Sequence, residues 1–374
     1  MSANEKLSIG VIFGGRSGEH EVSLASARSV IAALDPAKYD IVQIGINRSG
    51  AWVTGEDVLG RLTQEGTAGL SSSLTTCTLL PDPTHGGLYA IRGDEQAQNL
   101  EPLTQLDVIF PVLHGTFGED GTLQGLLELA GAAYVGAGVV GSAVCMDKDI
   151  FKRIMQAHGI PVLEWALVSR REVQADLAGL VARLIGLAPF PIFVKPANLG
   201  SSVGITKCRS RSDLAEGLLE AARFDRRILV ERGINGREIE VSVLGNTEPQ
   251  TSIPGEIRPA ADFYSYEAKY QDERSELLIP APLSPELASR IQTLAVQAYQ
   301  AADCAGMARV DFLLDQDSGA LYLNEINTIP GFTQISMYPK LWAASGLPYP
   351  QLLDRLIDLA LERQADRAQT VYRQ

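Results

Sequence analysis

Residues 308–331 read ARVDFLLDQDSGALYLNEINTIPG, and this segment says more about architecture than any other in the chain. Two apolar runs flank QDSG, a set of turn residues, so the pattern predicts an antiparallel β-hairpin. Side chains alternate between the two faces of a strand, so Glu325 and Asn327 point the same way. Antiparallel pairing would bring the carboxylate of Asp311, on the first strand, beside Glu325.

Two neighbouring carboxylates repel each other unless a cation neutralises them. Carboxylate and carboxamide oxygens are hard ligands suited to Mg²⁺, which shares its remaining positions with water and substrate phosphates. Asp311, Glu325 and Asn327 therefore indicate a metal-nucleotide site. The alternative is that all three are solvated residues on an exposed face of the sheet.

Length and charge restrict the classes of protein and partner. At 374 residues the chain is expected to form two or three domains. Its 45 acidic and 32 basic side chains give a net charge of −13, which argues against nucleic acid or an anionic membrane as the main partner. Four scattered cysteines without CxxC spacing indicate reduced thiols in a cytoplasmic protein.

Two segments bear on membranes and secretion. The N-terminus, MSANEKLSIGVIFGG, lacks the pattern of a signal peptide, so secretion is not expected. Residues 129–146 are uncharged over 18 positions, which is the lower limit for a membrane span. Four glycines in that segment favour a buried strand, a turn and the start of a helix instead.

The N-terminal third has an α/β pattern. An apolar run at 7–13, a glycine turn and helical spacing from Leu24 to Leu34 predict a strand, a turn and a helix. Further strand-length runs at 41–46 and 107–113 favour a doubly wound parallel sheet. The Gly-, Ser-, Thr- and Pro-rich stretch 54–104 has no assigned role.

After Asp147 the pattern becomes that of a mixed α+β unit. Short strands in WALV, PIFVKP, VGITKC and RILVERGI are interleaved with helical patterns at 172–186 and 212–223. Beyond residue 236 the sequence predicts a strand in EIEVSVLG, a helix at 285–303, the hairpin, and a final helix near Pro350.

Glycine-rich segments supply candidate anion and substrate sites. PIFVKPANLGSSVGITK places Lys195 before a glycine- and serine-rich loop, where backbone N–H groups and an ammonium can bind an anion, although the Walker A pattern is absent. An ordinary hairpin with a surface lysine is the alternative. In GGRSGEHE, Glu19 and Glu21 suit a cationic ligand such as an amino group, or simply complement a helix dipole, which is the better interpretation without further context.

His114 begins HGTFGEDGTLQG directly after a predicted strand, where α/β folds bind ligands. The imidazole either orients or exchanges protons with a substrate, or satisfies a turn.

Eight segments, taken in order, resemble motifs of the D-alanyl-D-alanine ligases of the ATP-grasp superfamily. They are GGRSGEHEVS, LHGTFGEDGTLQG, MDKDIFK, VKPANLGSSVG, VERGINGRE, FYSYEAKY, ARVDFLL and NEINTIPGFTQISMYP. The first carries EHEVS where many members have EREVS, which should leave Glu19 unaffected. The resemblance covers nearly the whole chain. It implies an N-terminal α/β substrate-binding domain at 1–125, a central ATP-grasp subdomain at 126–235, and a C-terminal ATP-grasp subdomain with the metal site at 236–374.

The resemblance also implies an activity, namely ATP-dependent ligation of two D-alanines for peptidoglycan synthesis through an acyl phosphate. Its cofactors would be ATP and two Mg²⁺ or Mn²⁺ ions, the metal being held by the three hairpin residues. A cytoplasmic homodimer with no nucleic-acid or membrane partner is expected.

The roles implied for single residues divide between the nucleotide and the two amino acids. The phosphate oxygens would bind Lys148, Lys195 and Lys269, and the adenosine would bind Glu231 and Glu238. On the amino-acid side, Glu19 would bind the first ammonium, Arg309 would stabilise the oxyanion, and Ser336 would receive the second carboxylate. Ser201 and Tyr270 would close the site together with Glu19.

Three alternatives remain at this point. A D-alanine:D-lactate ligase has the same fold, although Tyr270 resembles the dipeptide-forming members. A nucleotide sensor would bind ATP without turnover. Another ATP-grasp ligase would share the ATP half and differ in the first and last motifs.

Overall fold

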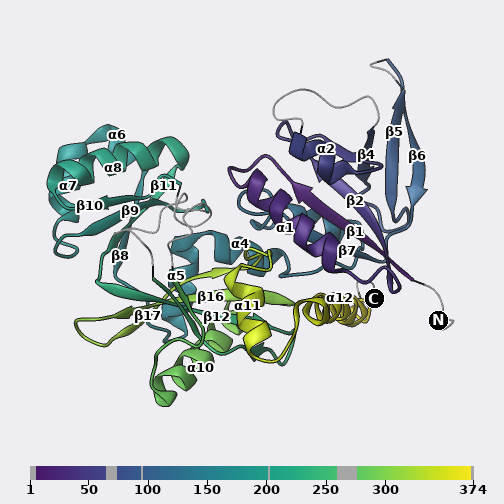
Figure 1. Cartoon of the computed structure of the whole chain (residues 1–374). Coiled ribbons are helices and arrows are strands. Elements are labelled where there is room, and N and C mark those ends of the chain that lie inside the picture. The colour runs from purple at the N-terminus through teal and green to yellow at the C-terminus, as the bar shows by residue number, and fades with distance from the viewer. Residues whose placement is uncertain (1–5, 65–73, 94–95, 201–202, 259–275, 372–374) are drawn as a thin grey trace.

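The computed structural model describes residues 6–64, 74–93, 96–200, 203–258 and 276–371. Three β-sheets organise the chain, and Figure 1 places the N-terminal and central sheets on opposite sides, with the third sheet below them. The fold class predicted from the sequence is confirmed. The division into domains at residues 125 and 235 stays a prediction.

The N-terminal sheet has the order β6-β5-β4-β3-β2-β1-β7. Its strands are β1 (Leu7–Gly14), β2 (Tyr39–Ile46), β3 (Trp52–Thr54), β4 (Thr75–Leu79), β5 (Leu88–Gly93), β6 (Gln98–Thr104) and β7 (Val108–Val112), and its helices are α1 (His20–Ala33), α2 (Val58–Gln64) and α3 (Thr122–Leu129). Only β2, β1 and β7 pair in parallel, as predicted. The segment without an assigned role supplies most of an antiparallel extension.

The central sheet has the order β10-β9-β11-β8 and its own apolar core. It is formed by β8 (Trp165–Ser169), β9 (Ile192–Pro196), β10 (Thr206–Cys208) and β11 (Arg227–Arg232), with α6 (Arg170–Ala175), α7 (Leu177–Leu184) and α8 (Arg211–Phe224) on one face. The single helix predicted at 172–186 is two helices, because the Asp176 carboxylate accepts from Gly179 N at 2.9 Å and starts α7 anew.

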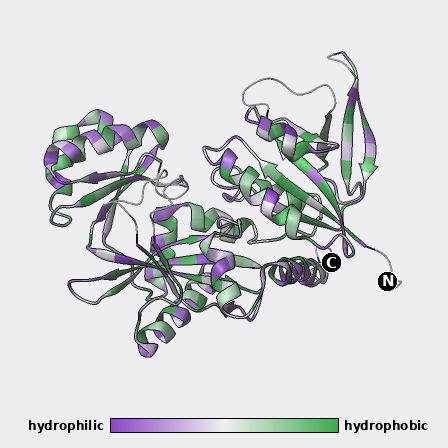
Figure 2. Cartoon of the chain, in the orientation of Figure 1, coloured by the Kyte–Doolittle hydropathy of each residue, from purple (hydrophilic) through white to green (hydrophobic). Residues whose placement is uncertain are grey.

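The third sheet carries the predicted hairpin and has the order β15-β14-β12-β16-β17, with β13 paired to β12. Its strands are β12 (Gly236–Leu244), β13 (Gln250–Thr251), β14 (Gly255–Arg258), β15 (Glu276–Leu278), β16 (Met307–Asp315) and β17 (Leu321–Asn327), and its core also takes residues from α4 (Val139–Met146), α5 (Lys148–Ala157) and α10 (Pro285–Ala301). Figure 2 shows apolar residues concentrated in the strands and mixed with polar residues along the helices.

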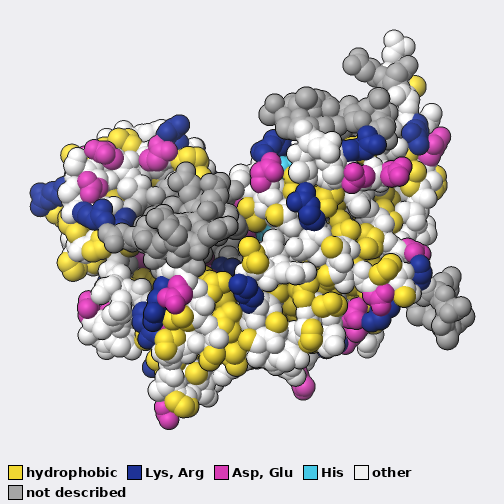
Figure 3. Space-filling model, in the orientation of Figure 1, with side chains coloured by type: hydrophobic (Ala, Val, Ile, Leu, Met, Phe, Trp, Pro, Cys, Tyr) yellow, Lys and Arg dark blue, Asp and Glu magenta, His cyan; other side chains and the backbone are white. Residues whose placement is uncertain are grey.

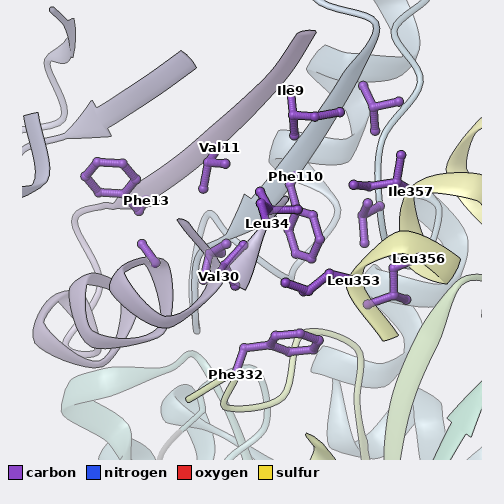
Figure 4. Packing of buried hydrophobic residues seen from close by; sticks show 14 of the residues in the cluster. Ile9, Val11, Phe13, Val30, Leu34, Phe110, Phe332, Leu353, Leu356 and Ile357 are labelled. Atoms are coloured by element: carbon purple, nitrogen blue, oxygen red, sulfur yellow. The ribbon is translucent and has the colours of Figure 1, made fainter. Parts of the chain in front are cut away.

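The N-terminal sheet shares a core with the C-terminal end of the chain. α12 (Tyr349–Arg367) packs Leu353, Leu356 and Ile357 against the face of the sheet that carries Phe110 (Figure 4). Phe332, which precedes α11 (Met337–Ala344), lies edge-on to Phe110 with ring centroids 6.0 Å apart. Burial of large aromatic and branched side chains makes these two parts one packed unit.

Residues 129–146 fold as the end of α3, a bridge between Tyr134 and Ile109, and α4, as predicted. No helix within the described ranges has both the length and the apolar character needed to cross a bilayer. On the face shown in Figure 3, basic and acidic side chains are interspersed and form no single basic patch.

Candidate active site

The hairpin forms in the predicted register, with Asp311 opposite Glu325 and Arg309 opposite Asn327. A β-bulge follows, because Phe312 pairs with Leu323 and leaves one extra residue on β17. The bulge reverses the alternation, so Leu321, Leu323 and Ile326 all join the core while Glu325 and Asn327 take the other face. The bulge explains how two polar residues fit into an apolar strand.

Arg309 is held between two carboxylates. Its Nε and Nη2 donate to the two oxygens of Asp311 at 2.8 and 2.7 Å, and its Nε lies 3.1 Å from Glu240 Oε2. Glu240 pairs opposite Asp311 on β12 and is buried. Burial alone would lower the pKa of Arg309, but these carboxylates outweigh burial and raise it well above its usual value.

The face of β16 and β17 that carries this cluster has the donor chemistry of a magnesium site. Asn327 Nδ2 donates to Asp311 Oδ2 at 2.8 Å, and Glu325 is directly across from Asp311. In the described part of the chain no three His, Cys, Asp or Glu side chains form a metal-holding cluster. The set here is two carboxylates and one amide, which suits a cation that keeps waters and substrate phosphates in its remaining positions.

Glu231 on β11 lies between two ammonium groups. Lys195 Nζ, from β9, is 2.5 Å from Glu231 Oε2, and Lys152 Nζ, from α5, contacts Oε1. Burial alone would raise the pKa of Glu231, but the two lysines lower it to about 2. Burial lowers the pKa of Lys152, and the Glu231 charge opposes this effect. With both lysines charged, one carboxylate against two ammonium groups leaves one excess positive charge, which favours an anionic ligand.

Lys148, at the start of α5, and Glu238, on β12, are two further predicted nucleotide ligands. Asp147 caps α5 by accepting from Ile150 N at 3.0 Å, and Lys148 Nζ donates to Leu199 O at 2.6 Å, at the start of the glycine- and serine-rich loop. Glu238 is half-buried and lies two positions before Glu240 on β12, so both face the same side.

Glu19 is buried beside two glycines from different loops. A Cβ built on Gly115 would come within 2.5 Å of Glu19 Oε2, and one on Gly200 within 3.1 Å. Gly115 also has φ +72°, a conformation that L side chains rarely adopt. Glycine at these positions lets the loops after β7 and β9 approach the carboxylate closely.

Glu119 is a second carboxylate near Glu19. It accepts from Gly115 N at 2.8 Å and from Ile329 N at 3.3 Å, so it joins the loop after β7 to the loop after β17. Burial, with the neighbouring Glu19 charge adding to it, raises the pKa of Glu119 to about 8. Glu119 lies within HGTFGEDG, but nothing in that segment marks its carboxylate as buried.

The raised pKa of Glu119 predicts a pH dependence of stability. The folded state binds a proton between pH 4.5 and about 8 that the unfolded state releases, so this group's stabilisation is lost as pH rises through that window. Replacing Glu119 with Gln costs one backbone hydrogen bond at every pH but removes the titration, so the thermal midpoint of the variant relative to the unmodified chain should increase from pH 5 to pH 8.5. Thermal melts at closely spaced pH values would show it, and a pH-independent difference would contradict it.

His114 is buried with both ring nitrogens engaged. Nδ1 lies 2.9 Å from Ile329 O, which can only accept, so Nδ1 carries the proton and Nε2 accepts from Ser26 Oγ at 3.1 Å. Burial lowers the pKa of His114, and Glu19 only partly offsets this effect. The geometry favours a neutral ring that orients the loop after β17 over one that exchanges protons.

Ser336 is the residue before α11, and its Oγ lies 2.7 Å from Thr333 Oγ1 and accepts from Thr333 N at 3.1 Å. A pocket of about 410 Å³ opens in the chain's N-terminal part, between the loop that follows β1 and the loop 113–118, and Ser336 does not line it. Three predicted site residues, Ser201, Lys269 and Tyr270, lie outside the described residues.

The chain is similar to known proteins over nearly its whole length. The pattern described as D-ala D-ala ligase N-terminus matches residues 8–137, and the one described as D-ala D-ala ligase C-terminus matches residues 154–358. D-alanine--D-alanine ligases of Natranaerobius thermophilus and Thermoanaerobacter sp. are 48% and 50% identical to the chain. The first alignment covers 97% of each sequence, and the second covers 96% of this chain and 97% of the relative.

Two solved structures are also similar. The D-alanine-D-alanine ligase of Coxiella burnetii has a TM-score of 0.80 at 40% identity, covering 97% of this chain and 96% of the other. The VanG D-Ala:D-Ser ligase of Enterococcus faecalis has a TM-score of 0.82 at 37% identity, covering 95% and 100%. The fold and site define an ATP-grasp ligase. Within that class, the chain belongs to the D-alanine–D-alanine ligase family.

Proposed function

We propose that the chain joins two D-alanines to D-alanyl-D-alanine at the expense of ATP, for the synthesis of peptidoglycan precursors. The observation that carries the proposal is the position of Glu325. Its charge acts on Lys152 in the lysine pair and on Glu119 beside Glu19. The carboxylate on the hairpin is therefore within electrostatic range both of a cationic cluster suited to phosphate and of a carboxylate-lined site suited to an ammonium group.

The first step transfers the γ-phosphoryl group of ATP to the carboxylate of one D-alanine, giving an acyl phosphate and ADP. Lys148, Lys195 and Lys269 bind the phosphate oxygens, while Glu231 and Glu238 accept hydrogen bonds from the adenine amino group and the ribose hydroxyls. Mg²⁺ or Mn²⁺, as two ions, would be held by Asp311, Glu325 and Asn327, and would offset the charge on the transferred group.

In the second step the amine of another D-alanine attacks the acyl carbon, the bond to the phosphate oxygen breaks, and the nitrogen loses a proton. Glu19 binds the ammonium of the first D-alanine, and Arg309 stabilises the oxyanion of the tetrahedral intermediate. Ser336 binds the carboxylate of the second D-alanine. His114 orients the loop after β17 through Ile329.

Closure of the site protects the acyl phosphate from water. We assign this role to Ser201 and Tyr270, together with Glu19. By likeness to the family, the chain acts in the cytoplasm as a homodimer.

A coupled ADP-release assay across D- and L-amino acids and D-lactate, with the product identified by mass, tests the proposal. ADP release that depends on D-alanine and yields the dipeptide is the expected result. ATP binding without such release would favour a nucleotide sensor, and an ester as the main product at neutral pH would favour a D-alanine:D-lactate ligase. D-Serine belongs in the panel, because one structural relative is a D-Ala:D-Ser ligase.

Replacing Ser336 with alanine should raise KM for the second D-alanine by about 10- to 100-fold, the effect of losing one hydrogen bond to a charged group. The KM for ATP should change by no more than about twofold, because Ser336 is proposed to contact the second D-alanine and not the nucleotide. Ser345→Ala, at the opposite end of α11, is the matched control. Equal changes in both KM values would contradict the assignment.

A further inference from the structure

We propose that Lys152 is a positioning residue of the nucleotide site, which shares the Glu231 carboxylate with Lys195 and so leaves the Lys195 ammonium available to phosphate. This role rests on the proposed function. It deepens the account of the ATP site, because the sequence motifs singled out Lys148 and Lys195 and left Lys152 unused.

Helix α5 places Lys152 one turn after Lys148, on the same helix face. The two ammonium groups then diverge, because Lys148 Nζ donates to Leu199 O whereas Lys152 Nζ reaches Glu231 Oε1. The side chain of Lys152 is only 3% exposed, compared with 15% for Lys195. Lys195 is therefore the member of the pair that faces a ligand, and Lys152 lies behind it.

Lys152 Nζ and Glu231 Oε1 form a buried ion pair, and neither atom has a further hydrogen-bond partner among the described residues. Burying an ammonium is costly in a folded protein, and a single carboxylate oxygen offsets only part of that cost. A lysine that served only as a counter-ion for Glu231 would be redundant, because Lys195 already contacts the other oxygen at 2.5 Å.

The second ammonium changes what Lys195 can do. With Glu231 paired only to Lys195, one carboxylate would neutralise one lysine and hold it away from an incoming anion. With Lys152 on the opposite oxygen, the carboxylate is shared and the cluster keeps one positive charge for phosphate. The expected loss on removing Lys152 therefore falls on nucleotide binding, through Lys195.

The experiment measures Mg-ATP and Mg-ADP binding by calorimetry in Lys152→Met, Lys152→Arg, Glu231→Gln and the double variant Lys152→Met/Glu231→Gln. Lys152→Met should weaken binding by about tenfold or more, the effect of one charge-assisted contact. When Glu231 is already replaced by Gln, Lys152→Met should weaken nucleotide binding several-fold less. The reason is that the neutral amide at position 231 no longer holds Lys195. Lys152→Arg should recover part of the affinity.

Arg153→Met is the matched control. Arg153 is the next residue on α5, but its side chain is 60% exposed and pairs with Asp149. Should Lys152→Met fail to fold, Lys152→Arg and the comparison of Glu231→Gln with the double variant still test the proposal. Unchanged nucleotide affinity in a less stable Lys152→Met protein, or equal effects of the lysine change in both backgrounds, would overturn it. An unmodified chain that does not bind ATP would instead refute the proposed function.

Discussion

Replacing Glu325 with glutamine is expected to reduce kcat by several orders of magnitude while leaving the fold intact. The amide keeps the size of the side chain and its place opposite Asp311, so packing changes little. It removes one of the two carboxylate charges from the proposed metal site, and with it the cation that offsets the charge on the transferred phosphoryl group. Steady-state kinetics at saturating ATP and D-alanine, repeated across Mg²⁺ concentrations, would measure the loss.

The control for this change is Glu276→Gln, an exposed carboxylate on β15 of the same sheet. Its kcat should match that of the unmodified chain, and the thermal midpoints of both variants should lie within a few degrees of it. Near-normal turnover of the Glu325 variant at ordinary Mg²⁺ concentrations would contradict the metal assignment.

Replacing Arg309 with lysine is expected to lower kcat by about 10²- to 10³-fold, the usual effect of removing one donor from an oxyanion site. Lysine keeps the positive charge but loses the planar fork that donates to both oxygens of Asp311 and contacts Glu240. An ammonium has three donors but no rigid fork, so it cannot keep the two parallel contacts to Asp311 and hold a third donor in the same direction toward the oxyanion.

Arg237→Lys offers a matched comparison, since Arg237 on β12 makes a similar two-pronged contact with buried Glu256 away from the site. Urea unfolding separates stability from catalysis, because both variants disturb an ion pair of the same kind and only one should lose turnover. A full kcat in the Arg309 variant would rule out its role at the oxyanion.

The hairpin could be predicted from sequence because the turn residues and the two apolar runs that define it are contiguous in the chain. The QDSG turn predicts the hairpin, but the register that leads out of it, with Leu314 opposite Leu321, would place Asp311 opposite Asn324. The bulge between Asp311 and Phe312 shifts the pairing by one residue and brings Asp311 opposite Glu325. The bulge could not be predicted, since strict alternation puts Leu321, Leu323, Glu325 and Asn327 on one face. Only packing against the core distinguishes the leucines from the polar pair.

Residues that sequence reasoning missed owe their importance to contacts between distant segments. Lys152 on α5 contacts the Glu231 carboxylate on β11. Glu119 accepts a hydrogen bond from Ile329 N, which is 210 positions away in the sequence. Glu240 had a local signal, two acidic residues at strand spacing in EIEVSVLG, but its partner Arg309 is on another strand. Likewise, the short strands between residues 52 and 104 form a sheet only by extending an existing edge.

The separate core of the central sheet has a mechanical consequence. Residues 168–230 supply every member of that cluster, whereas Phe332 and α12 are packed into the N-terminal core. Lys195 and Glu231 therefore lie on strands with their own core, joined to α5 by the Lys152–Glu231 ion pair, while Glu19 and Ser336 lie beside helices packed into other cores. Substitutions inside the core of the central sheet should therefore disturb the lysine pair without unpacking the residues around Glu19 and Ser336, so nucleotide affinity and amino-acid affinity can be altered by different mutations.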